Sequence, residues 1–88
     1  MKLIIAIVPD TDSDAVSHGL TSAGLKVTYI ASTGGFLRRG HSTLLIGLED
    51  EKVSGALQTI RENCAPAAAP GEKRGVIFVL NVAQFIHF

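Results

Sequence analysis

Cysteine, tryptophan and charged residues are all scarce in this sequence. Its single cysteine, Cys64, excludes an intramolecular disulfide and any metal site built from several thiolates. Charged residues make up only 18% of the chain, and eight Lys and Arg balance eight Asp and Glu. With no excess of either sign, binding to nucleic acid or to an acidic membrane through general positive charge is not expected.

A long apolar run is also absent. The opening segment 2–8 (KLIIAIV) is too short to span a membrane, and no small-residue cleavage site follows it, so we expect a cytoplasmic protein with no membrane insertion. What is present is a high apolar fraction, 47%, with a mean hydropathy of +0.33, which argues against disorder. A chain of 88 residues has room for one small domain, here spanning 1–88.

Hydrophobic periodicity predicts four strands and two helices. The first helix is expected over 12–23, with Asp10, Thr11 and Asp12 as candidate N-caps and Gly24 as its left-handed end. The second helix should begin at Asp50 as its cap and carry an apolar stripe from Val53 to Cys64. The expected strands are 2–8, 25–32, 41–48 and 76–82.

The order βαββαβ indicates an α+β, ferredoxin-like fold, in which two helices cover one face of a four-stranded antiparallel sheet. Strands such as LIIAIV and TLLIGL are apolar on both faces, yet the helices can cover only one. The other face would be a larger apolar patch than a soluble monomer usually exposes, so we expect a homo-oligomer. The apolar tail 83–88 (AQFIHF) is expected to pack or pair.

The sequence offers little support for an enzyme or for a bound metal or cofactor. His18, His41 and His87 lack metal-ligand spacing, and DTDSD lacks the glycine and the glutamate that a calcium loop of the EF-hand type needs. Acylphosphatase shares this topology, but it holds phosphate in a loop between the first strand and the first helix. Here that loop reads PDTDSD, which is acidic and has no glycine.

One stretch, residues 32–43 (STGGFLRRGHST), has a composition that a plain turn does not need. Gly34 and Gly35 allow close approach of the backbone to a ligand, and their N–H groups can face oxyanions. Phe36 offers a stacking face for a base, and Arg38 or Arg39 can pair with phosphate. The alternative is a two-stranded tip with glycines for positive φ and solvated arginines.

These residues resemble the PII-like cyclic di-AMP receptors of bacteria. The pieces that carry the resemblance are MKLIIAIVPDTDS, IASTGGFLRRGHST and VIFVLNVAQFIHF, which together cover nearly the whole chain. The resemblance implies a PII-like homotrimer whose sheets face inward and which binds cyclic di-AMP in clefts between subunits. It also implies a signalling role with a downstream protein partner that the sequence does not name.

The resemblance places the nucleotide-binding positions on residues spread along the chain, and Arg38 joins them as a phosphate contact. They are Lys26, Thr28, Gly35, Phe36, Leu37, Arg38, His41, Gly47, Phe78 and His87. Several depart from the family pattern: Lys26 stands for an arginine, His41 for an asparagine and His87 for a glutamine. The long loop that family members carry before the last strand is shortened here to about APAAAPGEKR.

These departures leave two other functions open. The chain could be a trimeric scaffold or partner-binding module that has lost the nucleotide site. It could also bind ATP or AMP, as ordinary PII proteins do.

Overall fold

The computed structural model describes residues 1–32, 40–66, 71 and 73–88. Along the chain they form four strands, two α-helices and a short 3₁₀ helix, Asp50–Lys52, just before the second α-helix. In order, the other elements are β1 (Lys2–Pro9), α1 (Asp10–Ser22), β2 (Thr28–Ser32), β3 (His41–Leu48), α2 (Val53–Glu62) and β4 (Val76–Asn81). The expected βαββαβ order is confirmed.

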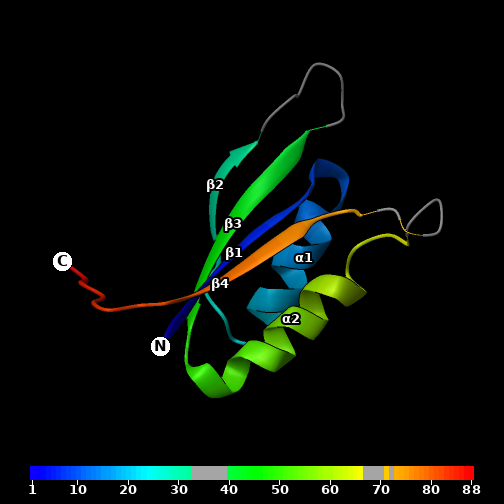
Figure 1. Cartoon of the computed structure of the whole chain (residues 1–88). Coiled ribbons are helices and arrows are strands. Elements are labelled where there is room, and N and C mark those ends of the chain that lie inside the picture. Colours follow the sequence, from blue (N-terminus) through cyan, green and yellow to red (C-terminus); the bar gives the residue numbers. More distant parts are fainter. Residues whose placement is uncertain (33–39, 67–70, 72) are drawn as a thin grey trace.

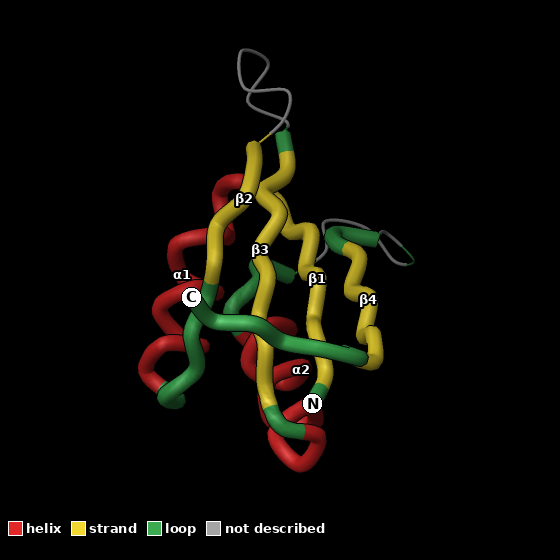
Figure 2. The backbone as a smooth tube through the Cα atoms, turned by 90° about the vertical axis from the view of Figure 1, so that its left-hand side faces the viewer, coloured by secondary structure: helices red, strands yellow, loops and turns green. Residues whose placement is uncertain are grey.

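The strands form one antiparallel sheet in the order β2-β3-β1-β4, and both helices cover the same face of it (Figure 1). Seen from the left-hand side of Figure 1, the four strands lie in front of the helices (Figure 2). Because β1 pairs with both β3 and β4, the first strand of the chain occupies the middle of the sheet. β2 and β4 are therefore the two edges.

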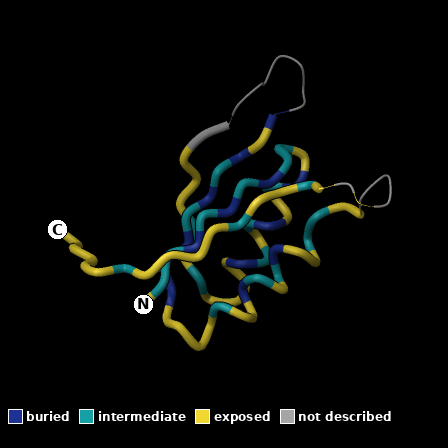
Figure 3. The backbone as a smooth tube through the Cα atoms, in the orientation of Figure 1, coloured by how far each residue is buried: buried dark blue, intermediate teal, exposed yellow. Residues whose placement is uncertain are grey.

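Successive side chains along the strands point to opposite sides of the sheet. One side is the helix face, which α1 and α2 cover, and the other is the open face, which no helix covers. On the helix face, every second residue of β1 and β3 is buried, and α1 and α2 supply the opposing side chains (Figure 3). This core consists of Ile4, Ala6, Val8, Val16, Leu20, Leu44, Ile46, Leu48, Ala56 and Ile60. The open face carries Leu3, Ile5, Ile7 and Leu45, which are only partly buried, and the more exposed Val76, Phe78 and Leu80.

The apolar second face expected from the strand sequences is therefore present. Val76, Phe78 and Leu80 keep 44–51% of their surface, and no helix covers them. Leucine, valine and phenylalanine side chains gain free energy on leaving water, by about 25 cal/mol per Å² of apolar area. A continuous patch of this kind is typical of a surface that another protein surface covers.

The predicted helix caps were wrong. Pro9 is the N-cap of α1, no side chain caps either α-helix, and Asp10 and Asp12 lie inside the first turn. Asp50, which was expected to cap the second helix, is the first residue of the 3₁₀ helix. Its Oδ1 forms an ion pair with the N-terminal amine of Met1 at 3.1 Å. Gly24, by contrast, has the expected left-handed conformation, with φ of 87°, directly after α1.

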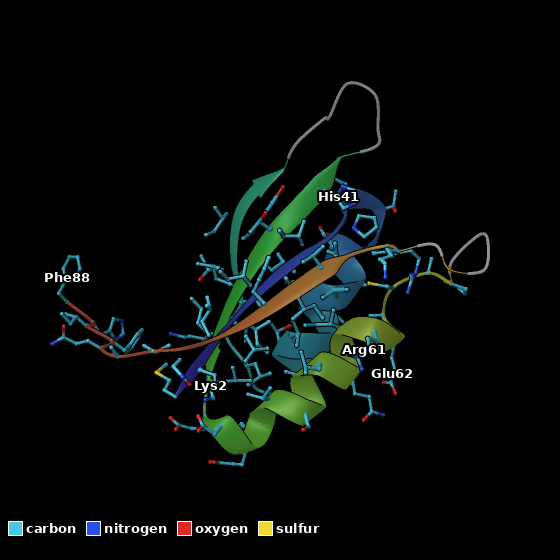
Figure 4. The ribbon with its side chains drawn as sticks, in the orientation of Figure 1. Lys2, His41, Arg61, Glu62 and Phe88 are labelled. Atoms are coloured by element: carbon cyan, nitrogen blue, oxygen red, sulfur yellow. The ribbon has the colours of Figure 1, made fainter. Side chains whose placement is uncertain are left out.

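The C-terminal tail, residues 83–88, does not pack on its own chain. The last backbone bond that holds it runs from the Val82 amide to the carbonyl of Met1, at 3.2 Å. Beyond it the chain leaves the sheet on the open side, and Phe85, Ile86 and Phe88 are at least 66% exposed (Figures 1 and 4). The expectation that this tail packs or pairs is thus not met within a single chain.

Candidate functional site

The ten predicted nucleotide-binding residues divide into two groups. Gly35, Phe36, Leu37 and Arg38 lie outside the described residues. The other six are all at least partly accessible, and they come from β2 with the segment before it, from β3, from β4 and from the tail: Lys26, Thr28, His41, Gly47, Phe78 and His87.

Thr28 and Phe78 lie in one row across the open face. Thr28 pairs with Leu45, Leu45 with Ile5, and Ile5 with Phe78, so the four side chains project from the same side of the sheet. Thr28 is on the β2 edge and Phe78 on the β4 edge, three strand spacings or about 14 Å apart. One subunit therefore does not bring them against a common base.

Gly47 and Lys26 lie on the same side as this row, toward one end of the strands. Gly47 pairs with Leu3, two residues from the Leu45–Ile5 pair. A Cβ added at Gly47 would lie 3.2 Å from Cε of Met1, so a larger residue would press on that side chain. Lys26 is exposed, and its neighbour Val27 points toward the core, which directs Lys26 away from it.

His41 lies at the opposite end of the open face. It is exposed, pairs with Pro9 at the start of β3, and lines a surface pocket of about 370 Å³ (Figure 4). Ile7 and Val76 form apolar parts of this pocket, while Lys73 and Arg74 add positive charge. His87 is in the exposed tail, where its ring lies 6.0 Å from that of Phe85.

Two features of this end of the sheet were missed by the sequence analysis. Lys73 and Arg74 precede β4 and join His41 at the pocket, although their adjacency before an apolar strand is visible in GEKRGVIFV. The second feature has no local signal: the Ser42 hydroxyl donates a hydrogen bond to Oδ1 of Asp10 at 2.6 Å. That bond joins two elements that are 32 residues apart.

The pKa values of Asp50 and Cys64 are shifted, each with an identifiable cause. The hydrogen bond from the N-terminal amine lowers the pKa of Asp50, and the charges of that amine and of Lys2 act in the same direction. Burial raises the pKa of the Cys64 thiol, as does the charge of Asp12, while Arg74 opposes both. Cys64 is therefore a neutral thiol at neutral pH.

No cluster of three or more His, Cys, Asp or Glu side chains that could hold a metal occurs among the described residues. In the same part of the chain, neither helix has the length and apolar character needed to cross a membrane.

Comparison with known proteins supplies the family. The model of the cyclic-di-AMP receptor family matches residues 1–69, more than three quarters of the chain. This chain belongs to the cyclic-di-AMP receptor family. The matched range of the receptor family ends before β4, so Phe78 and His87 lie beyond it.

A solved structure agrees with this receptor fold. The chain is similar to a functionally unknown protein from Pediococcus pentosaceus ATCC 25745, with 33% sequence identity and a TM-score of 0.77. The similarity covers 99% of this chain and 96% of the other. The ferredoxin-like architecture of this receptor-family member therefore extends over β4 and the tail as well as over the matched range.

Proposed function

We propose that this chain is a PII-like signalling protein that binds cyclic di-AMP, or a related adenine nucleotide, in clefts between the subunits of a homotrimer. Its membership of the cyclic-di-AMP receptor family carries the proposal. Its output would pass to a downstream protein rather than to a chemical reaction.

The placement of the predicted binding residues supports a cleft shared by two subunits. Lys26 and Thr28 are at the β2 edge of the open face, and Phe78 is at the β4 edge. A ligand that contacts both sets would need the β2 edge of one subunit beside the β4 edge of the next. In a ring of three subunits related by rotation, the same head-to-tail contact occurs at each of the three interfaces.

The open face supports the same arrangement. It exposes apolar side chains from β1, β3 and β4, and the tail leaves the sheet on this side (Figure 2). Three sheets packed around a common axis would bury these side chains. The exposed tail, with Phe85, Ile86 and Phe88, would then lie within reach of a neighbouring subunit.

The chemistry of the accessible residues suits an adenine nucleotide. Phe78 keeps 51% of its surface exposed and offers a ring face on which a base can stack. Lys26 supplies a positive charge on the same side of the sheet, available for a phosphodiester. Thr28 adds a hydroxyl donor and acceptor beside it.

Isothermal titration calorimetry with cyclic di-AMP, ATP, ADP and AMP tests this proposal. We expect cyclic di-AMP to bind, and Phe78→Ala to weaken its binding by about 1–3 kcal/mol, because a base–aromatic stacking contact is lost. Tyr29→Ala is the matched control. Tyr29 is 53% exposed, but it pairs with the buried Leu44 and so lies on the helix side of the sheet.

Other outcomes separate the remaining functions. Tighter binding of ATP or AMP than of cyclic di-AMP would indicate a mononucleotide receptor. Absence of heat with all four nucleotides, from a folded trimer, would contradict nucleotide binding and favour a scaffold or partner-binding module.

A further inference from the structure

A second pocket lies at the start of β4, toward the helix side, and it shares Arg74, Gly75 and Val76 with the pocket at His41. It has a volume of about 360 Å³ and is bordered by the end of α2, the residues just after it and the start of β4. Ile60 and Ile77 form apolar parts of its wall, and Arg61, Cys64 and Arg74 bring polar atoms to it. Ile77 pairs with the buried Ala6, which places this wall on the face opposite to Phe78.

Two arginines meet at this pocket without a counter-ion. Neither Arg61 nor Arg74 forms an ion pair with a carboxylate of the residues that the structure describes. Glu62, adjacent to Arg61 in the chain, accepts a hydrogen bond from Gln58 at 2.8 Å instead. Figure 4 shows Arg61 near the end of α2, apart from His41.

Arg74 is the more constrained of the two. Its Nη1 is buried and has no hydrogen-bond partner among the described residues. A buried donor without an acceptor costs free energy, and the cost is larger for a charged group. Such a position is favourable when an acceptor enters from outside the chain.

The side chain next to Arg74 does not neutralise it. Arg74 lines the pocket beside Cys64 and acts to lower the pKa of its thiol, but burial first and then the charge of Asp12 raise that pKa. The thiol therefore stays protonated at neutral pH. Asp12 affects that thiol but forms no ion pair with Arg74 in the described part of the chain. Arg74 thus brings an unused donor to the pocket.

We propose that this pocket binds a phosphate oxyanion, with Arg74 as the buried donor and Arg61 as the accessible one. Guanidinium groups pair with phosphate oxygens in bidentate geometry, and apolar walls strengthen the attraction by excluding water. The ligand is either free inorganic phosphate or the phosphate of a larger molecule. The site needs neither the trimer nor the nucleotide residues of the open face.

Cys64 provides a reporter inside the pocket, since it is the only cysteine of the chain. Its alkylation rate is measured on the native protein with neutral iodoacetamide and with anionic iodoacetate, in chloride or in inorganic phosphate at equal ionic strength. We expect millimolar phosphate to slow both reactions several-fold. Chloride at the same ionic strength should leave both rates unchanged.

Two variants test the arginines. Arg74→Gln and Arg61→Gln should each abolish the protection by phosphate and lower the ratio of the iodoacetate rate to the iodoacetamide rate. A change in the thiol pKa affects both reagents equally, so this ratio isolates the local charge. Lys52→Gln is the control, because it removes one exposed positive charge just before α2. Circular dichroism checks that each variant is folded. If Arg74→Gln does not fold, Arg61→Gln still tests the proposal, because Arg61 is exposed.

The same alkylation assay with other ligands identifies which part of a larger molecule is recognised. Protection by AMP as well as by inorganic phosphate, but not by adenosine, supports the proposal. Equal protection by adenosine would overturn it, because the base would then be the recognised group. Undiminished alkylation of the wild-type protein in phosphate would also overturn it and leave Arg74 as a structural partner of Cys64. The Phe78→Ala variant should keep full phosphate protection, so failure of the nucleotide proposal and failure of this one are distinguishable.

Discussion

Asp10 and Ser42 show how single residues hold the ends of two elements together. Asp10, the first residue of α1, accepts the hydrogen bond from the buried Ser42 hydroxyl, and its amide donates to the carbonyl of Gly40 at 3.0 Å. Gly40 and Ser42 flank His41, so both bonds fix the backbone from which that side chain projects. Asp10 was expected to cap its own helix, and its observed role is a long-range one.

Ser42→Ala is expected to lower the free energy of unfolding by about 1.5–3 kcal/mol, the range for a hydrogen bond to a charged group. Ser42 is only 1% exposed, and its bond to Asp10 is partly buried. Urea unfolding measures the change. Ser54→Ala, at an exposed position of α2, should change stability by less than about 0.5 kcal/mol. Equal effects of the two substitutions would show that the bond to Asp10 contributes nothing.

At the scale of elements, the two helices lie in close contact at Gly19. A Cβ added there would lie 2.6 Å from Nδ2 of Asn63 and 3.0 Å from Cγ2 of Thr59. The Asn63 amide is itself held, because Nδ2 donates to the carbonyl of Thr59 at 2.8 Å. Gly55 in α2 is different, since no heavy atom lies within 4 Å of an added Cβ.

These two glycines predict opposite effects for the same substitution. Gly55→Ala should stabilise the protein by about 0.5–1 kcal/mol, because alanine has the higher helix propensity and nothing obstructs it. Gly19→Ala gains the same propensity but displaces Asn63 and Thr59, so it should be less stable than Gly55→Ala by about 1–2 kcal/mol. Thermal unfolding of both variants beside the wild type measures the difference. A similar gain in both would mean that α1 and α2 separate easily.

The bounds of a helix or strand could be predicted from the sequence where they depend on the pattern of neighbouring residues. The strand 41–48 has the predicted bounds, because alternating apolar residues and flanking polar residues mark it. The strand expected over 25–32 begins only at Thr28: Leu25 and Val27 are apolar because they pack against the core, before pairing starts. The cross-sheet row that contains Thr28 and Phe78 depends on the register of distant strands. Neither that row nor the unpartnered nitrogen of Arg74 can be derived from spacing along the chain.

For the whole molecule, the exposed half of the sheet is the dominant feature. The helices bury the central strands β1 and β3 on one face, while β4 and the tail remain exposed over most of their length (Figure 3). A chain of this size has a small core of its own. Burial of the open face between subunits would add stability that one layer of helices does not supply. The exposed apolar face therefore favours the proposed homotrimer.

Light scattering after size exclusion should therefore give about three times the chain mass of 9.3 kDa. Leu80→Lys, which places a charge among the apolar side chains of the open face, should shift the protein toward monomer, because burial of an unpaired charge is costly. The secondary structure seen by circular dichroism should remain. A monodisperse wild-type monomer at micromolar concentration would contradict the trimer and the shared cleft.

The central position of β1 has a consequence for how the protein is made. Lys2 pairs with Asn81 and Ile5 with Phe78, so during synthesis β1 receives its second neighbour only after β4 has emerged. Until then β1 has an unpaired edge, and pairings over such sequence distances form slowly. Synthesis at 5–20 residues per second thus leaves a nascent chain with an open sheet for several seconds. During that interval, a transient partner that shields the β1 edge would raise the yield of folded subunits.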